Sequence, residues 1–75
     1  MPKVRVIRAN PGVSSQVLTS ALVAATDLEM AEADALVRTF VNAPTVVEGS
    51  STHEHRLRQI ASVLQNHGYE VAFDA

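Results

Sequence analysis

The chain has 75 residues, of which 47% are hydrophobic and 19% are charged, with a formal net charge of −2. This composition is typical of a globular chain rather than a disordered one, and the length allows one small domain, which we place at residues 1–75. The sequence has no cysteine, which excludes a disulfide framework and a cysteine-based zinc site, and the weak negative charge argues against nucleic-acid binding.

No apolar run approaches the roughly 18 residues that a membrane span needs, so we expect no membrane-embedded segment. The first residues, Met1 to Arg5, lack the long apolar region of a signal peptide. We therefore expect a cytoplasmic location.

The first predicted element is a strand over Lys3 to Arg8, where charged and apolar residues alternate. The segment Asn10–Gly12 ends it, because proline lacks an amide donor and glycine tolerates turns. A helix capped by Ser14 or Ser15 is predicted to follow. Its apolar residues recur at helical spacing and are Val17, Leu18, Ala21, Leu22 and Ala25.

A second helix is predicted to begin near Leu28 or Glu29, because Thr26 and Glu29 have the spacing of a capping box. Pro44 prevents its continuation. Its expected apolar stripe consists of Met30, Ala33, Leu36 or Val37, and Phe40. The β-branched segment from Thr45 to Glu48 then predicts a short strand.

The third helix is predicted to begin at a second capping box, formed by Ser51 and Glu54, and to end at Gly68. Its core stripe is Leu57, Ile60, Ala61 and Leu64. The alternating segment from Tyr69 to Asp74 predicts the last strand, with Tyr69, Val71 and Phe73 on one face.

The predicted order is therefore β-α-α-β-α-β, an α+β fold with a three-stranded sheet and helices packed on one face. If the strands around Val47 and Val71 are partners, they are parallel and joined by a right-handed crossover. The opposite sheet face is expected to be exposed and to carry charges that pair across strands. These charges are Lys3, Arg5, Glu70 and Asp74.

The segment Ala25–Val37 resembles the helix-elbow-helix of the C-terminal domain of the bacterial ribosomal stalk protein. Pro44, the pair Glu48-Gly49 and the segment Gly68–Val71 follow in that family's order. The resemblance implies the same fold and binding to translation GTPases. That family binds them through basic residues on the first helix and elbow. Those positions are uncharged in this sequence, at Ser15, Ser20, Val23 and Ala31.

From Arg8 to Glu54 the sequence also resembles ClpS, an adaptor that presents N-degron substrates to the Clp protease and shares the stalk-domain fold. ClpS binds the degron's amino group through an Asn-Asp-Asp stretch and a histidine. Here Ala9, Asn10, Pro11 and Val41 occupy those places. Asn10 is thus a candidate remnant of the degron loop, and degron capture is not expected, because an ammonium group needs charged acceptors.

The candidate partner-binding residues lie in the elbow and the second helix. They are Asp27, Leu28, Glu29, Met30, Glu32 and Asp34. The four acids form a negative surface that selects partners by charge, with the two apolar residues as anchors. The alternatives are a solvated acidic face, core packing of Leu28 and Met30, and binding at the open sheet face instead.

No catalytic or metal motif is present. His53 and His55 are two residues apart and so point to different sides of a helix, and no serine lies in a nucleophile motif. We expect no enzyme activity, no metal and no cofactor. The sequence predicts a small protein-interaction module that acts as an adaptor or modulator. The alternatives are a degenerate ClpS-like protein that binds a Clp chaperone and a stalk mimic that binds the translation machinery. A homodimer is also among the expected assemblies.

Overall fold

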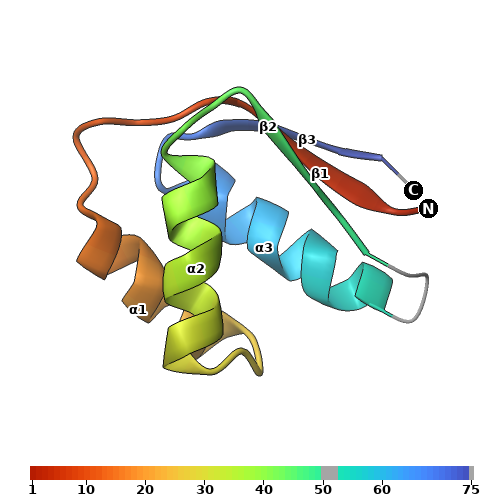
Figure 1. Ribbon diagram of the computed structural model, residues 1–75, viewed down its shortest axis with the longest axis horizontal. Coiled ribbons are helices and arrows are strands. Elements are labelled where there is room, and N and C mark those ends of the chain that lie inside the picture. The colour runs from red at the N-terminus through yellow and green to blue at the C-terminus, as the bar shows by residue number, and fades with distance from the viewer. Residues whose placement is uncertain (50–52, 75) are drawn as a thin grey trace.

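The computed structural model describes residues 1–49 and 53–74. The elements are β1 (Lys3–Arg8), α1 (Ser15–Ala25), α2 (Met30–Phe40), β2 (Thr45–Glu48), α3 (Glu54–Asn66) and β3 (Glu70–Asp74). Figure 1 shows the strands as one layer with the helices on one side of it. α3 packs against β1 and β3, α1 packs against α3, and α2 packs against α1. The predicted α+β fold and its element order are confirmed.

β1 is the central strand, and it pairs antiparallel with β2 on one side and with β3 on the other. The register places Val4 between Val47 and Phe73. Val4 and Val6 are both buried, which shows that this face of the sheet meets the helices. The strands β2 and β3 are therefore not partners. They run parallel to each other on either side of β1, and α3 connects them.

The opposite face of the sheet carries the predicted charges, and some of them pair across strands. Arg5 Nε donates to Asp74 Oδ2 at 2.7 Å, and Arg8 Nη2 lies 3.8 Å from Glu70 Oε1. Both pairs are exposed, so each contributes about 0–1 kcal/mol. They set the charge pattern of this face more than they stabilise the fold.

The helix starts depend on short side-chain contacts. Ser14 Oγ accepts a hydrogen bond from the Val17 amide, as predicted for the α1 cap. The predicted capping box of Thr26 and Glu29 is wrong. The Thr26 hydroxyl donates to the Leu22 carbonyl and accepts from the Leu28 amide, so it closes α1 instead. Glu29 is the cap of α2, and its amide donates to Glu32.

The core confirms most of the predicted apolar stripes, but the predicted core residues Val17, Ala25 and Met30 are exposed. Leu57, Ile60, Ala61 and Leu64 of α3 are buried, as are Ala33, Val37 and Phe40 of α2 and Leu18 and Leu22 of α1. Val17 and Met30, however, are 51% and 58% exposed. In α1, Thr19 is buried instead of Val17. Met30 is the first residue of α2, so its side chain lies beyond the end of the core stripe.

The end of α3 matches the sequence prediction. Gly68 has a φ of +82°, the left-handed conformation that favours glycine after a helix. A Cβ atom at this position would lie 2.5 Å from Asn10 Nδ2. Gly68 is thus required both by its backbone conformation and by the approach of the β1–α1 loop. The predicted capping box of Ser51 and Glu54 lies partly outside the described residues.

Candidate partner-binding site

Two of the four predicted acidic residues, Asp27 and Asp34, are paired with arginines. Asp27 accepts two hydrogen bonds from Arg56, and Asp34 Oδ2 lies 3.0 Å from Arg38 Nη2. Glu29 and Glu32 contact each other at the start of α2. The arginine pairing of Asp27 and Asp34 weakens the electrostatic attraction that these two carboxylates exert on another protein, whereas Glu29 and Glu32 accept hydrogen bonds from backbone amides and keep their negative charge.

Asp27 lies in the loop between α1 and α2, and Arg56 in the first turn of α3. Arg56 Nε and Nη2 donate to Asp27 Oδ1 and Oδ2, each at 3.0 Å. The planar guanidinium matches the carboxylate in this bidentate geometry. The hydrogen bonds from Arg56 hold the pKa of the Asp27 carboxyl below its ordinary value of 3.8. The predicted elbow residue thus fixes the loop against α3.

The two predicted apolar anchors have different positions. Leu28 is only 6% exposed and belongs to the core, so it is not available to a partner. Met30 is 58% exposed and lines a groove between α1 and α2. Of the two, Met30 alone lies where another protein can contact it.

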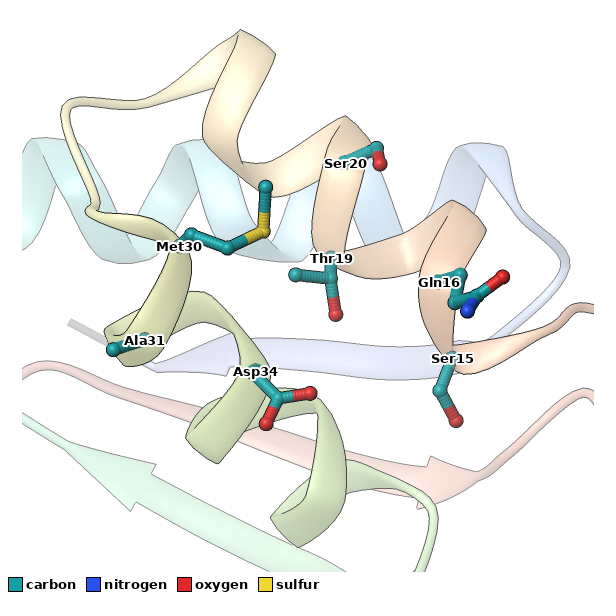
Figure 2. Close-up of a pocket in the computed structure, with 7 residues that line it drawn as sticks. All are labelled: Ser15, Gln16, Thr19, Ser20, Met30, Ala31 and Asp34. Carbon is teal, nitrogen blue, oxygen red and sulfur yellow. The ribbon is translucent and has the colours of Figure 1, made fainter.

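The groove between α1 and α2 has a volume of about 700 Å³. It is lined by Ser15, Gln16, Thr19 and Ser20 of α1 and by Met30, Ala31 and Asp34 of α2. Figure 2 shows the Met30 side chain extending from α2 toward α1, and the Thr19 side chain directed from α1 toward α2. Most of these side chains are small or uncharged, and Asp34 supplies the one carboxylate of this lining.

The Thr19 hydroxyl is a buried polar group without a partner. The residue is 6% exposed, and Oγ1 has no hydrogen bond. Thr26 and Thr39 both donate to the carbonyl four residues earlier, at 2.6 and 3.2 Å. An unpaired buried hydroxyl costs about 1–3 kcal/mol. Because the oxygen itself is buried, the unpaired Thr19 hydroxyl is a cost to the fold and not a hydrogen-bonding group that a partner can reach.

The exposed side of α1 adjoins this groove and carries no charge. The helix sequence, Ser15–Ala25, has no charged residue, and its exposed side chains include Gln16, Val17, Ser20 and Ala24. On α2, Met30 and Ala31 are exposed at the other side of the groove. We call these six residues the α1–α2 face. In contrast, all five arginines of the chain, which lie on other elements, contact carboxylates.

No protein-family model, no curated protein and no solved structure matches this chain. The resemblances to the stalk domain and to ClpS therefore stay predictions.

Asn10, the candidate degron-loop residue, forms hydrogen bonds within the chain that connect two of its segments. Its amide Nδ2 donates to the His67 carbonyl at 2.9 Å, and its Oδ1 accepts from the Gly12 amide. These contacts connect the β1–α1 loop to the end of α3.

Neither a metal-ligand cluster nor a membrane-spanning helix occurs in the described part of the chain. Within residues 1–49 and 53–74, no cluster of three or more potential ligand side chains could hold a metal ion. In the same ranges, no helix is both long and apolar enough to span a membrane. His67 Nδ1 lies 2.8 Å from the Val63 carbonyl oxygen of its own helix.

The sequence prediction found Met30 but missed the residues of α1 that lie across the groove. Ser15, Gln16, Thr19 and Ser20 form no motif; the sequence indicates Ser15 as a possible helix cap, and Ser15 and Ser20 as uncharged positions where the stalk family is basic. A signal was present, because the chain has no charged residue between Arg8 and Asp27. An exposed helix without charge is the feature that could have identified this face.

Proposed function

We propose that this chain is a small protein–protein interaction module, an adaptor or modulator without catalysis, that binds another protein through the α1–α2 face. The observation that carries the proposal is the uncharged exposed side of α1, which continues across the groove to the exposed Met30. A cytoplasmic location is part of this proposal.

Two features of the α1–α2 face, its lack of charge and the exposed Met30, match the centres of protein interfaces, whereas its serine and alanine residues do not. Interface centres are depleted in charged residues and enriched in methionine and aromatic residues. Gln16 and Ser20 add uncharged hydrogen-bonding groups, and the ion pair of Asp34 and Arg38 lies at the margin of the groove. The small side chains of Ala24 and Ala31 allow another backbone to approach closely.

The Clp chaperone and the translation machinery are the partners that the two resemblances imply. The observed β-α-α-β-α-β order is common to both families and does not favour either partner. Calorimetry against the chaperone's N-terminal domain and co-sedimentation with ribosomes test these two candidates directly. Heat in the first experiment or co-sedimentation in the second would name the partner.

Affinity capture with matched charge variants tests the proposed face. Ser20→Arg places a cation at the middle of the face, and Ser62→Arg places the same group on an exposed position of α3. Arginine favours helix, so both variants are expected to keep the fold. We expect Ser20→Arg to lose proteins that the wild type and Ser62→Arg retain. Equal capture by all three proteins would overturn the proposed function.

A further inference from the structure

We propose that the outer edge of β2 binds an extended segment of another protein, which adds to the sheet as a further antiparallel strand. The segment alternates apolar residues, one of which enters a groove beneath this edge, with basic residues on the open face of the sheet. This site is separate from the α1–α2 face. Three observations support it: the outward backbone groups of β2, the groove beside them, and the charges along the edge.

The first observation is the direction of the backbone groups of β2, which borders the sheet (Figure 1). The Gly49 amide donates to the Pro2 carbonyl, directly before β1, at 3.1 Å. The backbone groups of successive strand residues point to opposite sides of a strand. Val47 therefore faces β1 as Gly49 does, whereas the amides and carbonyls of Val46 and Glu48 face outward. A further strand can pair with these two residues.

The opposite edge of the sheet is partly covered. The same alternation directs the backbone groups of Val71 and Phe73 in β3 outward. One of them, the Val71 carbonyl, accepts a hydrogen bond from Gln65 Nε2 at 3.4 Å. Covering an edge in this way protects a sheet from strand addition. No side chain in residues 1–49 and 53–74 bonds to the outward groups of Val46 or Glu48, so β2 is the more accessible edge.

The second observation is a groove of about 330 Å³ between α2, β2 and α3. Leu36 of α2 and Val47 on the helix-facing side of β2 line it and are only partly buried, whereas Val4 in the central strand is fully buried. Leu57 and Ile60 of α3 also line it. Neighbouring strands are about 4.8 Å apart, and side chains opposite each other share one face of a sheet. The partner residue opposite Val47 is therefore directed into this groove.

The third observation is the charge along the edge. On the open face, Glu48, Lys3 and Asp74 form a row across the three strands in which acid and base alternate. A basic residue beside Glu48 on the added strand continues this alternation, because opposite charges on adjacent strands attract. Glu32 adds a second carboxylate to the groove lining, and the arginine of that lining is already paired with Asp27. The edge therefore selects a basic segment over an acidic one.

Nuclear magnetic resonance titration with a capped hexapeptide, in which lysine alternates with isoleucine, tests the site on the purified protein. We expect hydrogen exchange at the amides of Val46 and Glu48 to slow at least about tenfold at saturation. In the antiparallel pairing the lysine amides of the peptide face β2. N-methylation of the lysines should therefore weaken binding about tenfold or more, and N-methylation of the isoleucines should not. Protection at Val71 and Phe73 instead, or no binding up to about 5 mM peptide, would overturn the proposal.

Two substitutions in β2 test the edge and its charge. Val46→Pro removes one outward amide and is tolerated on an edge strand, while Val46→Thr keeps that amide and a β-branched side chain. We expect only Val46→Pro to weaken peptide binding, by about tenfold. Glu48→Lys should reverse the preference from the lysine peptide to its glutamate counterpart. An unchanged preference, or protection of Val46 and Glu48 that rises with protein concentration without peptide, would overturn the proposal; the latter would make a second copy the occupant.

Discussion

Asp27 and Arg56 are joined by two parallel hydrogen bonds, each 3.0 Å long, that fix the loop between α1 and α2 to the first turn of α3. Asp27 was predicted from the sequence to contact a partner protein. In the structure its carboxylate is occupied within the chain. The contact ties the loop that joins α1 and α2 to α3.

The pair predicts a pH-dependent contribution to stability. The pKa of Asp27 is lower in the folded protein than its ordinary value of 3.8. Its stabilising effect is therefore fully present above that value and is lost as the pH falls through the folded-state pKa. We expect Asp27→Asn to lower the urea midpoint at about pH 7 and to have no effect at a pH well below 3.8. An equal loss at both pH values would contradict the role of the ion pair.

Substitution of Gly68 is expected to lower the stability of the protein strongly. Gly68→Ala would place a side chain at a φ of +82° and a Cβ atom 2.5 Å from Asn10 Nδ2. We expect it to lower the free energy of unfolding by about 2–3 kcal/mol, from the strained backbone and the lost Asn10–His67 hydrogen bond. Chemical denaturation measures this loss.

Asn10→Ala separates the two causes. In that background the clash at Gly68 disappears and only the backbone cost remains, so Gly68→Ala should then cost about 1–2 kcal/mol. If the cost of Gly68→Ala is the same with and without Asn10, the two residues are not coupled. That result would contradict the structural role assigned to Asn10.

Alanine substitutions at Leu28 and Met30 are expected to have different effects on stability, although only Glu29 separates the two positions. Leu28→Ala removes a side chain that is 6% exposed and should cost about 2–4 kcal/mol of unfolding free energy. Met30→Ala changes a side chain that is 58% exposed and should cost less than about 1 kcal/mol. Met30→Ala should instead weaken capture of partners. Comparable stability losses for both variants would place Met30 in the core.

Thr19 predicts a stabilising substitution. Thr19→Val keeps the branched shape and replaces the unpaired hydroxyl with a methyl group. We expect it to raise the free energy of unfolding by about 1 kcal/mol. Thr39→Val is the control, because it removes a hydroxyl that is bonded to Ala35. A loss of stability for Thr19→Val equal to that of the control would show that the Thr19 hydroxyl is satisfied in solution.

The strands and the core of α3 could be predicted from sequence because their alternation or helical spacing reports burial directly. Val4 and Val6 alternate with charged residues, and Leu57, Ile60 and Leu64 recur at helical spacing. The cap of α2 could not be chosen in the same way. Thr26 and Glu29 both have suitable side chains, and the outcome depends on the Leu22 carbonyl that Thr26 reaches.

The candidate binding site depends on contacts between residues far apart in the sequence, and these contacts have no local pattern. The pairing of Asp27 with Arg56 joins the loop between α1 and α2 to the first turn of α3. The exposure of Met30 and the burial of Leu28 follow from how the chain turns between α1 and α2. The sequence could therefore place the site near α2, but the packing of α1 was needed to define the groove.

The most direct measurement is site-specific photo-cross-linking in cells that express the protein. A photoactivatable phenylalanine analogue is placed at Ser20 on the α1–α2 face or at Ser62 on α3. This readout detects both a second copy of the chain and a different protein. We predict strong adducts from position 20 and weak or no adducts from position 62. Adducts from position 62 without any from position 20 would contradict the assignment of the binding face.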